Sequence, residues 1–168
     1  AVPTTRVLEL TEPRQRFVFH GVDAEPVPSL LRDFSAPVIV DFPYTDSQLA
    51  FLVAHDADPF NRWEAAQRLA VNAIVAVIGG AGEQAASSGL VAAIARLLDD
   101  DGLDPAFREL LLTLPTEGVV SEQLAVVDPA RLRDVRNRLL ARIAGELAPR
   151  WRALWHDLAA AGRFSPDP

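Results

Sequence analysis

Three Asp-Pro pairs constrain the fold of this chain more than any other feature of its sequence. They stand at Asp58-Pro59, Asp104-Pro105 and Asp128-Pro129, and each precedes an apolar run with helical spacing. An Asp side chain caps the free amides at the start of a helix, and its charge suits the positive end of the helix dipole. Pro fits the first helical position because its φ is already helical and no needed donor is lost. The sequence therefore predicts helices with defined beginnings at these points.

The helical pattern starts at Asp46 and continues almost to the end of the chain. Gly and Pro residues divide it, so about seven helices are expected. After a first helix from Asp46, the expected spans are 59–78, 88–99, 105–114, 117–127, 129–148 and 150–161, with Gly162 as the stop and a tail at 164–168. Because the connections are short, successive helices should pack antiparallel, as a superhelical stack of helix pairs.

Residues 1–45 show a different pattern, which predicts β-strands. Short segments rich in β-branched and aromatic residues occur at 7–10, 16–19 and 37–40, and turn residues separate them. Pro26 and Pro28 favour a sheet edge or a strand start between them. About four strands fit this length, and so small a β-unit rarely stands alone. We expect either packing on the helices or membership of a larger sandwich.

Composition narrows the classes of partner. The formal net charge is −7, which opposes nonspecific binding to nucleic acid or to an anionic membrane. The most apolar stretch, Leu69 to Ile78, is far shorter than the roughly 20 residues that a membrane span needs. No signal peptide is visible at the first residue. The sequence thus favours a soluble protein, and we expect a cytoplasmic location.

Three residue types, Met, Lys and Cys, are absent from the sequence. Met is absent, so the sequence is not expected to be a complete, unprocessed translation product. All sixteen basic residues are Arg, a bias that suggests a bacterial source with a high-GC genome. Cys is absent as well, which excludes disulfides and thiol chemistry but leaves the redox compartment open.

The histidines are poor candidates for a metal site. A catalytic zinc needs converging imidazole or carboxylate ligands, usually with two of them one helical turn apart. The only histidines are His20, His55 and His156, and none has a second His three or four residues away. We therefore predict no catalytic, cofactor-binding or metal-binding residue in this chain.

Other motifs favour structural roles. Asp99-Asp100-Asp101-Gly102 fails as a calcium loop because position twelve would be Arg108, so a solvated acidic corner is expected. Gly79–Gly82 follows a helix and lacks a following Gly-Lys-Ser/Thr, so it indicates a helix connection. Ser87, Ser88 and Ser121 lie in no nucleophile elbow, and Ser88 is a candidate helix cap.

Arginines gather on residues 129–152, which is net positive in an acidic chain. A nucleic-acid face is one reading of this segment. However, Asp134 and Arg138, like Arg142 and Glu146, have the spacing of ion pairs within a helix. We favour a solvated or interdomain face and expect no nucleic-acid partner.

Several longer segments resemble the aminopeptidase N type of zinc metallopeptidase. They are FVF at 17–19, PVPSLL at 26–31, DFSAPV at 33–38, QLAFL at 48–52, DPFNRWEAAQ at 58–67, LDPAF at 103–107, LTLP at 112–115 and DP-x-x-L at 128–132. These are packing, capping and turn elements, in the order that the family has them. The family's H-E-x-x-H motif, which supplies zinc ligands and a general base, is absent from the chain.

The resemblance implies a noncatalytic part of a zinc-dependent aminopeptidase that removes N-terminal residues from peptides. Residues 1–45 would be the C-terminal part of an Ig-like β-sandwich domain, and residues 46–168 the first part of an α-helical C-terminal domain. Zinc would belong to a catalytic domain of the same parent chain, and this part would brace and enclose the active-site chamber. The alternative is a stand-alone helical scaffold that binds a protein partner. In either case the exposed β-part is a candidate for self-association.

Overall fold

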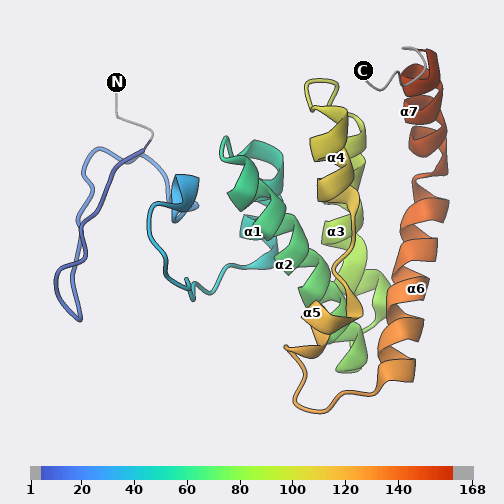
Figure 1. Cartoon of the computed structure of the whole chain (residues 1–168), viewed down its shortest axis with the longest axis horizontal. Helices are drawn as coiled ribbons and strands as arrows, with labels where there is room; N and C mark the ends of the chain where they lie inside the picture. Colours follow the sequence, from blue (N-terminus) through green and yellow to red (C-terminus); the bar gives the residue numbers. More distant parts are fainter. Residues whose placement is uncertain (1–4, 161–168) are drawn as a thin grey trace, which may run out of the picture.

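The computed structural model describes residues 5–160 of the chain. Within them lie a short 3-10 helix, η1 (Arg32–Phe34), and seven α-helices. The α-helices are α1 (Asp46–His55), α2 (Pro59–Ile78), α3 (Glu83–Leu98), α4 (Pro105–Leu112), α5 (Glu117–Ser121), α6 (Pro129–Glu146) and α7 (Ala148–Ala160). Figure 1 shows them in order, and the predicted mainly helical fold is confirmed.

Side-chain caps explain where most of these helices begin. Asp58, Asp104 and Asp128 each accept a backbone amide from the first turn of α2, α4 and α6, and a Pro follows each of them. At the start of α1, Thr45 and Gln48 form a capping box in which each side chain bonds to the other residue's amide. The helix starts predicted from the Asp-Pro pairs are therefore confirmed.

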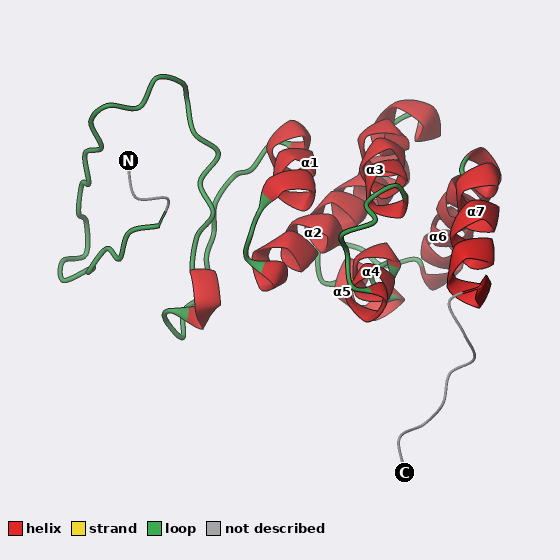
Figure 2. Cartoon of the chain, turned by 90° about the horizontal axis from the view of Figure 1, so that it is seen from above, coloured by secondary structure: helices red, strands yellow, loops and turns green. Residues whose placement is uncertain are grey.

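Helix α2 lies at the centre of the helical part, with contacts to α1, α3, α4, α5 and α6. Helix α7 lies at one edge, where it contacts α3 and α6. Figure 2 shows the helices following one another across the molecule from α1 to α6 and α7. Apolar side chains from these helices form one core, including Leu49, Ile74, Leu97, Val120 and Leu132. Each such side chain stabilises the fold by about 1.5–3 kcal/mol when fully buried.

Helix α3 begins earlier than the sequence predicted, at Glu83 instead of Ser88. Ser88 is not a cap, because its hydroxyl donates to the carbonyl oxygen of Ala85 inside the helix. Ser87 behaves in the same way and donates to the carbonyl of Glu83 at 2.6 Å. Both hydroxyls bond back to the preceding turn, which lets Ser occupy a helix interior.

The later helix ends also differ from the prediction. Helix α4 ends at Leu112 and α5 ends at Ser121, so 122–127 is a connection and not a helix. Pro149 divides α6 from α7, as expected, and it does so as the second residue of α7, where no donor is needed. The predicted stop at Gly162 and the tail at 164–168 lie outside the described residues.

The predicted strands are not confirmed: the described residues 5–45 contain η1 and loops but no strand. A strand exists through a hydrogen-bonded ladder to a neighbour, and an Ig-like sandwich uses about seven strands. The segments 7–10, 16–19 and 37–40 have no ladder partner within the described chain. Their apolar side chains are consequently exposed, to 83% at Val7 and 100% at Ile39. Figure 1 shows this segment as loops beside α1.

No helix in residues 5–160 is both long enough and apolar enough to span a bilayer.

Candidate functional site

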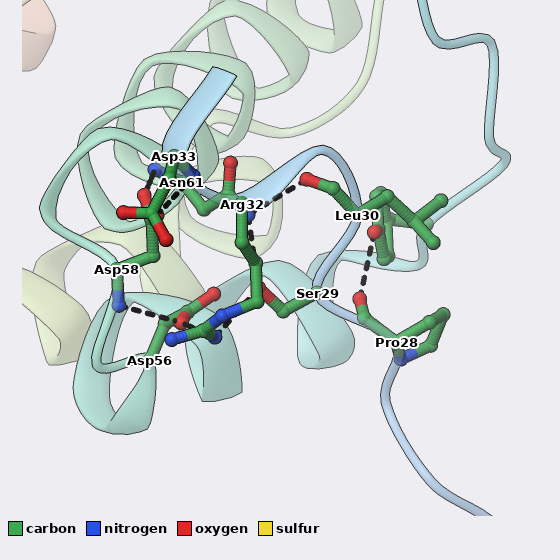
Figure 3. A network of polar contacts seen from close by, with 9 residues as sticks. Pro28, Ser29, Leu30, Arg32, Asp33, Asp56, Asp58 and Asn61 are labelled. Atoms are coloured by element: carbon green, nitrogen blue, oxygen red, sulfur yellow. Dashed lines mark hydrogen bonds and ion pairs between the residues drawn. The ribbon is translucent and has the colours of Figure 1, made fainter. Parts of the chain in front are cut away.

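A polar network joins the N-terminal loops to the connection between α1 and α2. Figure 3 shows its members approaching one another from these two parts of the chain. The partners are far apart in sequence, by 24 to 32 residues. We call this the junction network, and its residues are Ser29, Leu30, Arg32, Asp33, Asp56, Asp58 and Asn61.

Asp58 is the centre of the junction network. Its Oδ1 accepts the amide of Asn61 at 2.9 Å, and its Oδ2 accepts the amide of Asp33 at 2.9 Å. Only 4% of the residue is exposed. Burial acts to raise the pKa of Asp58, but the amides of Asn61 and Asp33 and the charge of Arg32 outweigh it and hold that pKa below its ordinary value. Asp58 is therefore an ionised carboxylate. It caps α2 and at the same time binds the N-terminal segment.

Arg32 and Asp56 form the ion pair of the network. Arg32 Nη1 lies 2.7 Å from Asp56 Oδ1, and 1% of the Asp56 side chain is exposed. The same oxygen accepts the amide of Asp58 at 2.9 Å, whereas Asp56 Oδ2 is buried without a hydrogen-bond partner in the described chain. Breaking such a pair is costly, because the remaining buried charge loses its partner.

Asn61 connects the first turn of α2 to the loop before η1. Its Nδ2 donates to the carbonyl oxygen of Leu30 at 2.8 Å and to Ser29 Oγ at 2.9 Å. The Asn61 side chain is thus a bridge between α2 and the N-terminal segment, separate from the cap that Asp58 makes with the Asn61 amide.

The network holds a backbone turn of unusual conformation. Leu31, Asp33 and Phe34 have φ values of 53°, 54° and 52°, in the left-handed region that Gly prefers. Each costs about 1–2 kcal/mol in a residue with a Cβ atom. Phe34 packs on Phe60 of α2 with ring centroids 4.2 Å apart, which adds an apolar contact to the polar ones.

A cavity of about 270 Å³ lies between this turn and helices α1 and α2. Tyr44 lines this cavity, and its hydroxyl donates to the carbonyl of Pro28 at 2.7 Å. Burial raises the pKa of Tyr44, with Glu64 and Asp56 adding to the effect and Arg68 opposing it. The cavity offers apolar contact more than reactive groups, since its lining includes Leu30, Leu31, Phe34, Val38, Ile39, Val40, Leu49, Leu52, Phe60 and Ala65.

The three histidines lie in separate elements. His20 is in the N-terminal segment, His55 ends α1 and His156 is in α7. The His55 ring packs on that of Phe51, with centroids 4.7 Å apart. In residues 5–160 no group of three or more His, Asp or Glu is arranged to hold a metal ion. Since catalytic zinc needs three protein ligands in one place, the described donor set does not fit zinc.

The acidic corner expected at 99–102 is tied to arginines. Asp99 pairs with Arg150 at 3.0 Å, and Asp100 pairs with Arg62 at 3.2 Å. The buried guanidinium of Arg108 donates to the backbone carbonyl of Asp100. These contacts give the corner a structural role.

The glycine-rich stretch Gly79–Gly82 connects α2 to α3, as the sequence indicated. Gly80 has a φ of +100°, a conformation that residues with a side chain rarely adopt.

The arginines of α6 make several ion pairs. The two predicted pairs are present, with Arg138 at 2.6 Å from Asp134 and Arg142 at 2.8 Å from Glu146. Arg138 also reaches Glu83 of α3 at 3.1 Å. The first two pairs lie within α6, and the Arg138–Glu83 pair joins α6 to α3. The solvated or interdomain face stays a prediction.

Reasoning from the sequence did not find the junction network. Five of its seven residues fall within the family-like segments PVPSLL, DFSAPV and DPFNRWEAAQ, and Arg32 and Asp56 lie close to these segments. Nothing local reveals that Asp58 meets the amide of Asp33, because that contact depends on how the chain turns between them.

Two family models match the chain. Residues 46–168 match the domain of unknown function DUF3458_C, described as ARM repeats. Residues 1–43 match the domain of unknown function DUF3458, described as an Ig-like fold. The second match agrees with the strand-like pattern of these residues, although their described part forms no strand.

The curated relatives and the solved structure that the chain matches are all aminopeptidases. The chain is 36% identical to aminopeptidase N of Escherichia coli K12 over 92% of its length and 18% of that protein. It is 36% identical to aminopeptidase N of Caulobacter vibrioides over 97% of its length and 19% of that protein. It also matches a crystal structure of Legionella pneumophila aminopeptidase A in complex with aspartic acid, with a TM-score of 0.76, 29% identity, and coverage of 89% of this chain and 17% of that one. The chain thus spans less than a fifth of the relatives that it matches, and the predicted resemblance is confirmed.

Proposed function

We propose, from the premise that this chain belongs to the DUF3458_C family of ARM-repeat domains, that it serves as a noncatalytic part of a zinc-dependent aminopeptidase. The observation that carries the proposal is 36% identity to two aminopeptidases N along nearly the whole chain. In such an enzyme the chemistry, removal of N-terminal residues from peptides, belongs to another domain of the same polypeptide.

The role we assign to this part is to brace and enclose the active-site chamber. Two features support that role: the helices share one buried core, and the junction network fixes the preceding segment to α2. The described donor set does not fit zinc, so the zinc is assigned to the catalytic domain of the parent enzyme. No step of the reaction is assigned to residues of this chain.

The proposed organisation has two units, 1–45 as the C-terminal part of an Ig-like domain and 46–168 as the first part of a helical domain. The matched ranges 1–43 and 46–168 support that division. We also propose a bacterial source and a cytoplasmic location. The bacterial sources of the aminopeptidase N relatives support the first of these.

A chimera tests the proposal. The matched segment of Escherichia coli aminopeptidase N is replaced by this chain, and zinc-dependent hydrolysis of an alanyl amide is measured. We expect a folded, active chimera, and a matched chimera carrying Leu49→Asp in the buried core should lose activity. A folded chimera without activity would contradict the proposal. The chain by itself, supplied with zinc and the same amide, should show no turnover above the blank.

A stand-alone helical scaffold for a protein partner is the second candidate. The observation in its favour is that α1 to α6 bury a core of their own, as a scaffold of ARM repeats requires. The reading frame around the first residue distinguishes the two. Several hundred preceding residues with H-E-x-x-H support the peptidase, and a start codon directly upstream supports the scaffold.

A further inference from the structure

The turn from Ser29 to Phe34 has a strained backbone. Three of its residues, Leu31, Asp33 and Phe34, hold left-handed backbone conformations although none is Gly. Local strain of this kind persists only where surrounding contacts over-determine it. The turn would relax if those contacts were released.

The contacts that hold the turn come from one short region, the connection of α1 to α2 and the first turn of α2. Asp58 accepts the amide of Asp33, Asp56 pairs with Arg32, and Asn61 donates to Ser29 and Leu30. Phe60 adds the ring contact with Phe34. Figure 3 shows the polar partners on both sides of this contact. One short region of the chain, 56–61, therefore supplies all of these contacts to the turn.

We propose that Ser29–Phe34 is a strained clasp with two states, docked on α2 and released, and that it controls how firmly the N-terminal segment is held to the helices. In the docked state the junction network offsets the cost of the left-handed residues. In the released state the backbone returns to ordinary conformations and the segment before residue 29 moves away from α2. This proposal does not depend on the proposed enzyme, since it concerns contacts within this chain.

Two substitutions should shift the equilibrium between the docked and released states in opposite directions. Asn61→Ala removes both donors to Ser29 and Leu30 but leaves the Asn61 amide on Asp58, so the cap of α2 is kept. Asp33→Gly removes an exposed side chain, keeps the amide that Asp58 binds, and removes the penalty for a φ of 54°. A mutation that merely weakens the fold would not give this opposite pair of effects.

Amide hydrogen exchange of the full chain measures the clasp directly. The protection factors of the Asp33 and Ser35 amides, both hydrogen-bonded when docked, are compared with those inside α2. We expect Asn61→Ala to lower the protection factors of the Asp33 and Ser35 amides about tenfold. Asp33→Gly should raise the protection factor of each about fivefold. The interior amides of α2 should stay unchanged. Gln67→Ala is the matched control, because it removes a side-chain amide bond from α2 to the Thr113 carbonyl, away from the clasp.

A distance measurement provides an independent readout. The sequence has no Cys, so spin labels can be placed by Glu25→Cys before the clasp and Gln84→Cys on α3, both exposed positions. The background chain should give a main docked distance, and adding Asn61→Ala should raise a second, broader population. Unchanged exchange and distances in Asn61→Ala, or lower protection in Asp33→Gly, would overturn the proposal.

Discussion

The guanidinium of Arg142 in α6 donates to the hydroxyl of Ser87 in α3, with Nη1 and Oγ 2.7 Å apart, and Ser87 is completely buried. Arg142 Nη1 also donates to the carbonyl of Glu83 at 3.1 Å, and the Ser87 hydroxyl donates to the same carbonyl. Helix α6 is thus joined to the first turn of α3 by polar bonds in addition to its apolar face.

Replacing Arg142 tests the energetic value of that connection. Arg142→Met keeps much of the packing but removes the donors to Ser87 and Glu83 and the pair with Glu146. We expect the free energy of unfolding in urea to fall by about 1–3 kcal/mol. Arg133→Met is the control, since its pair with Glu117 is exposed and such pairs contribute about 0–1 kcal/mol. Equal losses in the two variants would contradict the prediction.

The core can be tested with two Leu→Ala substitutions in helices. Leu49 is 1% exposed, so Leu49→Ala should lower the free energy of unfolding by about 2–5 kcal/mol through lost burial and a cavity. Leu110 is 56% exposed, so Leu110→Ala should change it by no more than about 0.5 kcal/mol. A small effect at Leu49 would mean that α1 does not pack on the other helices as described.

The cap of α6 is the third test. Asp128 Oδ1 accepts the amides of Ala130 and Arg131 at 3.0 and 3.1 Å. Asp128→Ala should therefore lower the free energy of unfolding by about 0.5–2 kcal/mol. Asp128→Asn keeps an accepting oxygen and should recover most of this loss. Failure of Asn to recover any of it would argue against the capping role.

The ionisation of Asp58 predicts a pH dependence. The folded pKa of Asp58 lies below its ordinary value of 3.8, so its contribution to stability is present above that pH and is lost as the pH falls through the folded pKa. The charged groups around it are Arg32 and Asp33 from η1 and Asp56 from the α1–α2 connection. Urea unfolding of the wild type and Asp58→Asn should differ by a constant amount at neutral pH, and the difference should shrink below about pH 4. A gap that widens on acidification would refute the assignment.

Self-association through the N-terminal segment is the fifth prediction. Ile39 is fully exposed and Val38 is 59% exposed in a segment with strand-like residues and no ladder partner in the described chain. We expect sedimentation velocity to show a concentration-dependent dimer that Ile39→Glu removes. Val126→Glu, at an 83% exposed site in the α5–α6 connection, should leave it intact. A monomer at all concentrations, or equal effects of both variants, would exclude this surface.

Local sequence signals were sufficient to predict where several of the helices begin. Asp58, Asp104 and Asp128 act within one turn of their own helix, so their role can be inferred from the sequence. The start of α3 differs because the Ser88 hydroxyl bonds back into the helix, which sequence alone does not distinguish from a cap.

The N-terminal segment and the junction network could not be inferred in the same way. The pattern at 37–40 indicates residues suited to a sheet, but a strand also requires a neighbour, and that information is not local. The bond from Asp33 to Asp58 spans 25 residues and forms on a left-handed turn without Gly, a conformation that sequence rules disfavour.

The central place of α2 determines how this chain should come apart on heating. In a linear array of repeats each unit meets only its neighbours, so the units can melt one at a time. Here five other α-helices contact α2, so unfolding of α2 would remove a packing surface from all five at the same time. A calorimetric scan should accordingly show a single cooperative transition for α1 to α6, with α7, which does not touch α2, free to fray at a lower temperature.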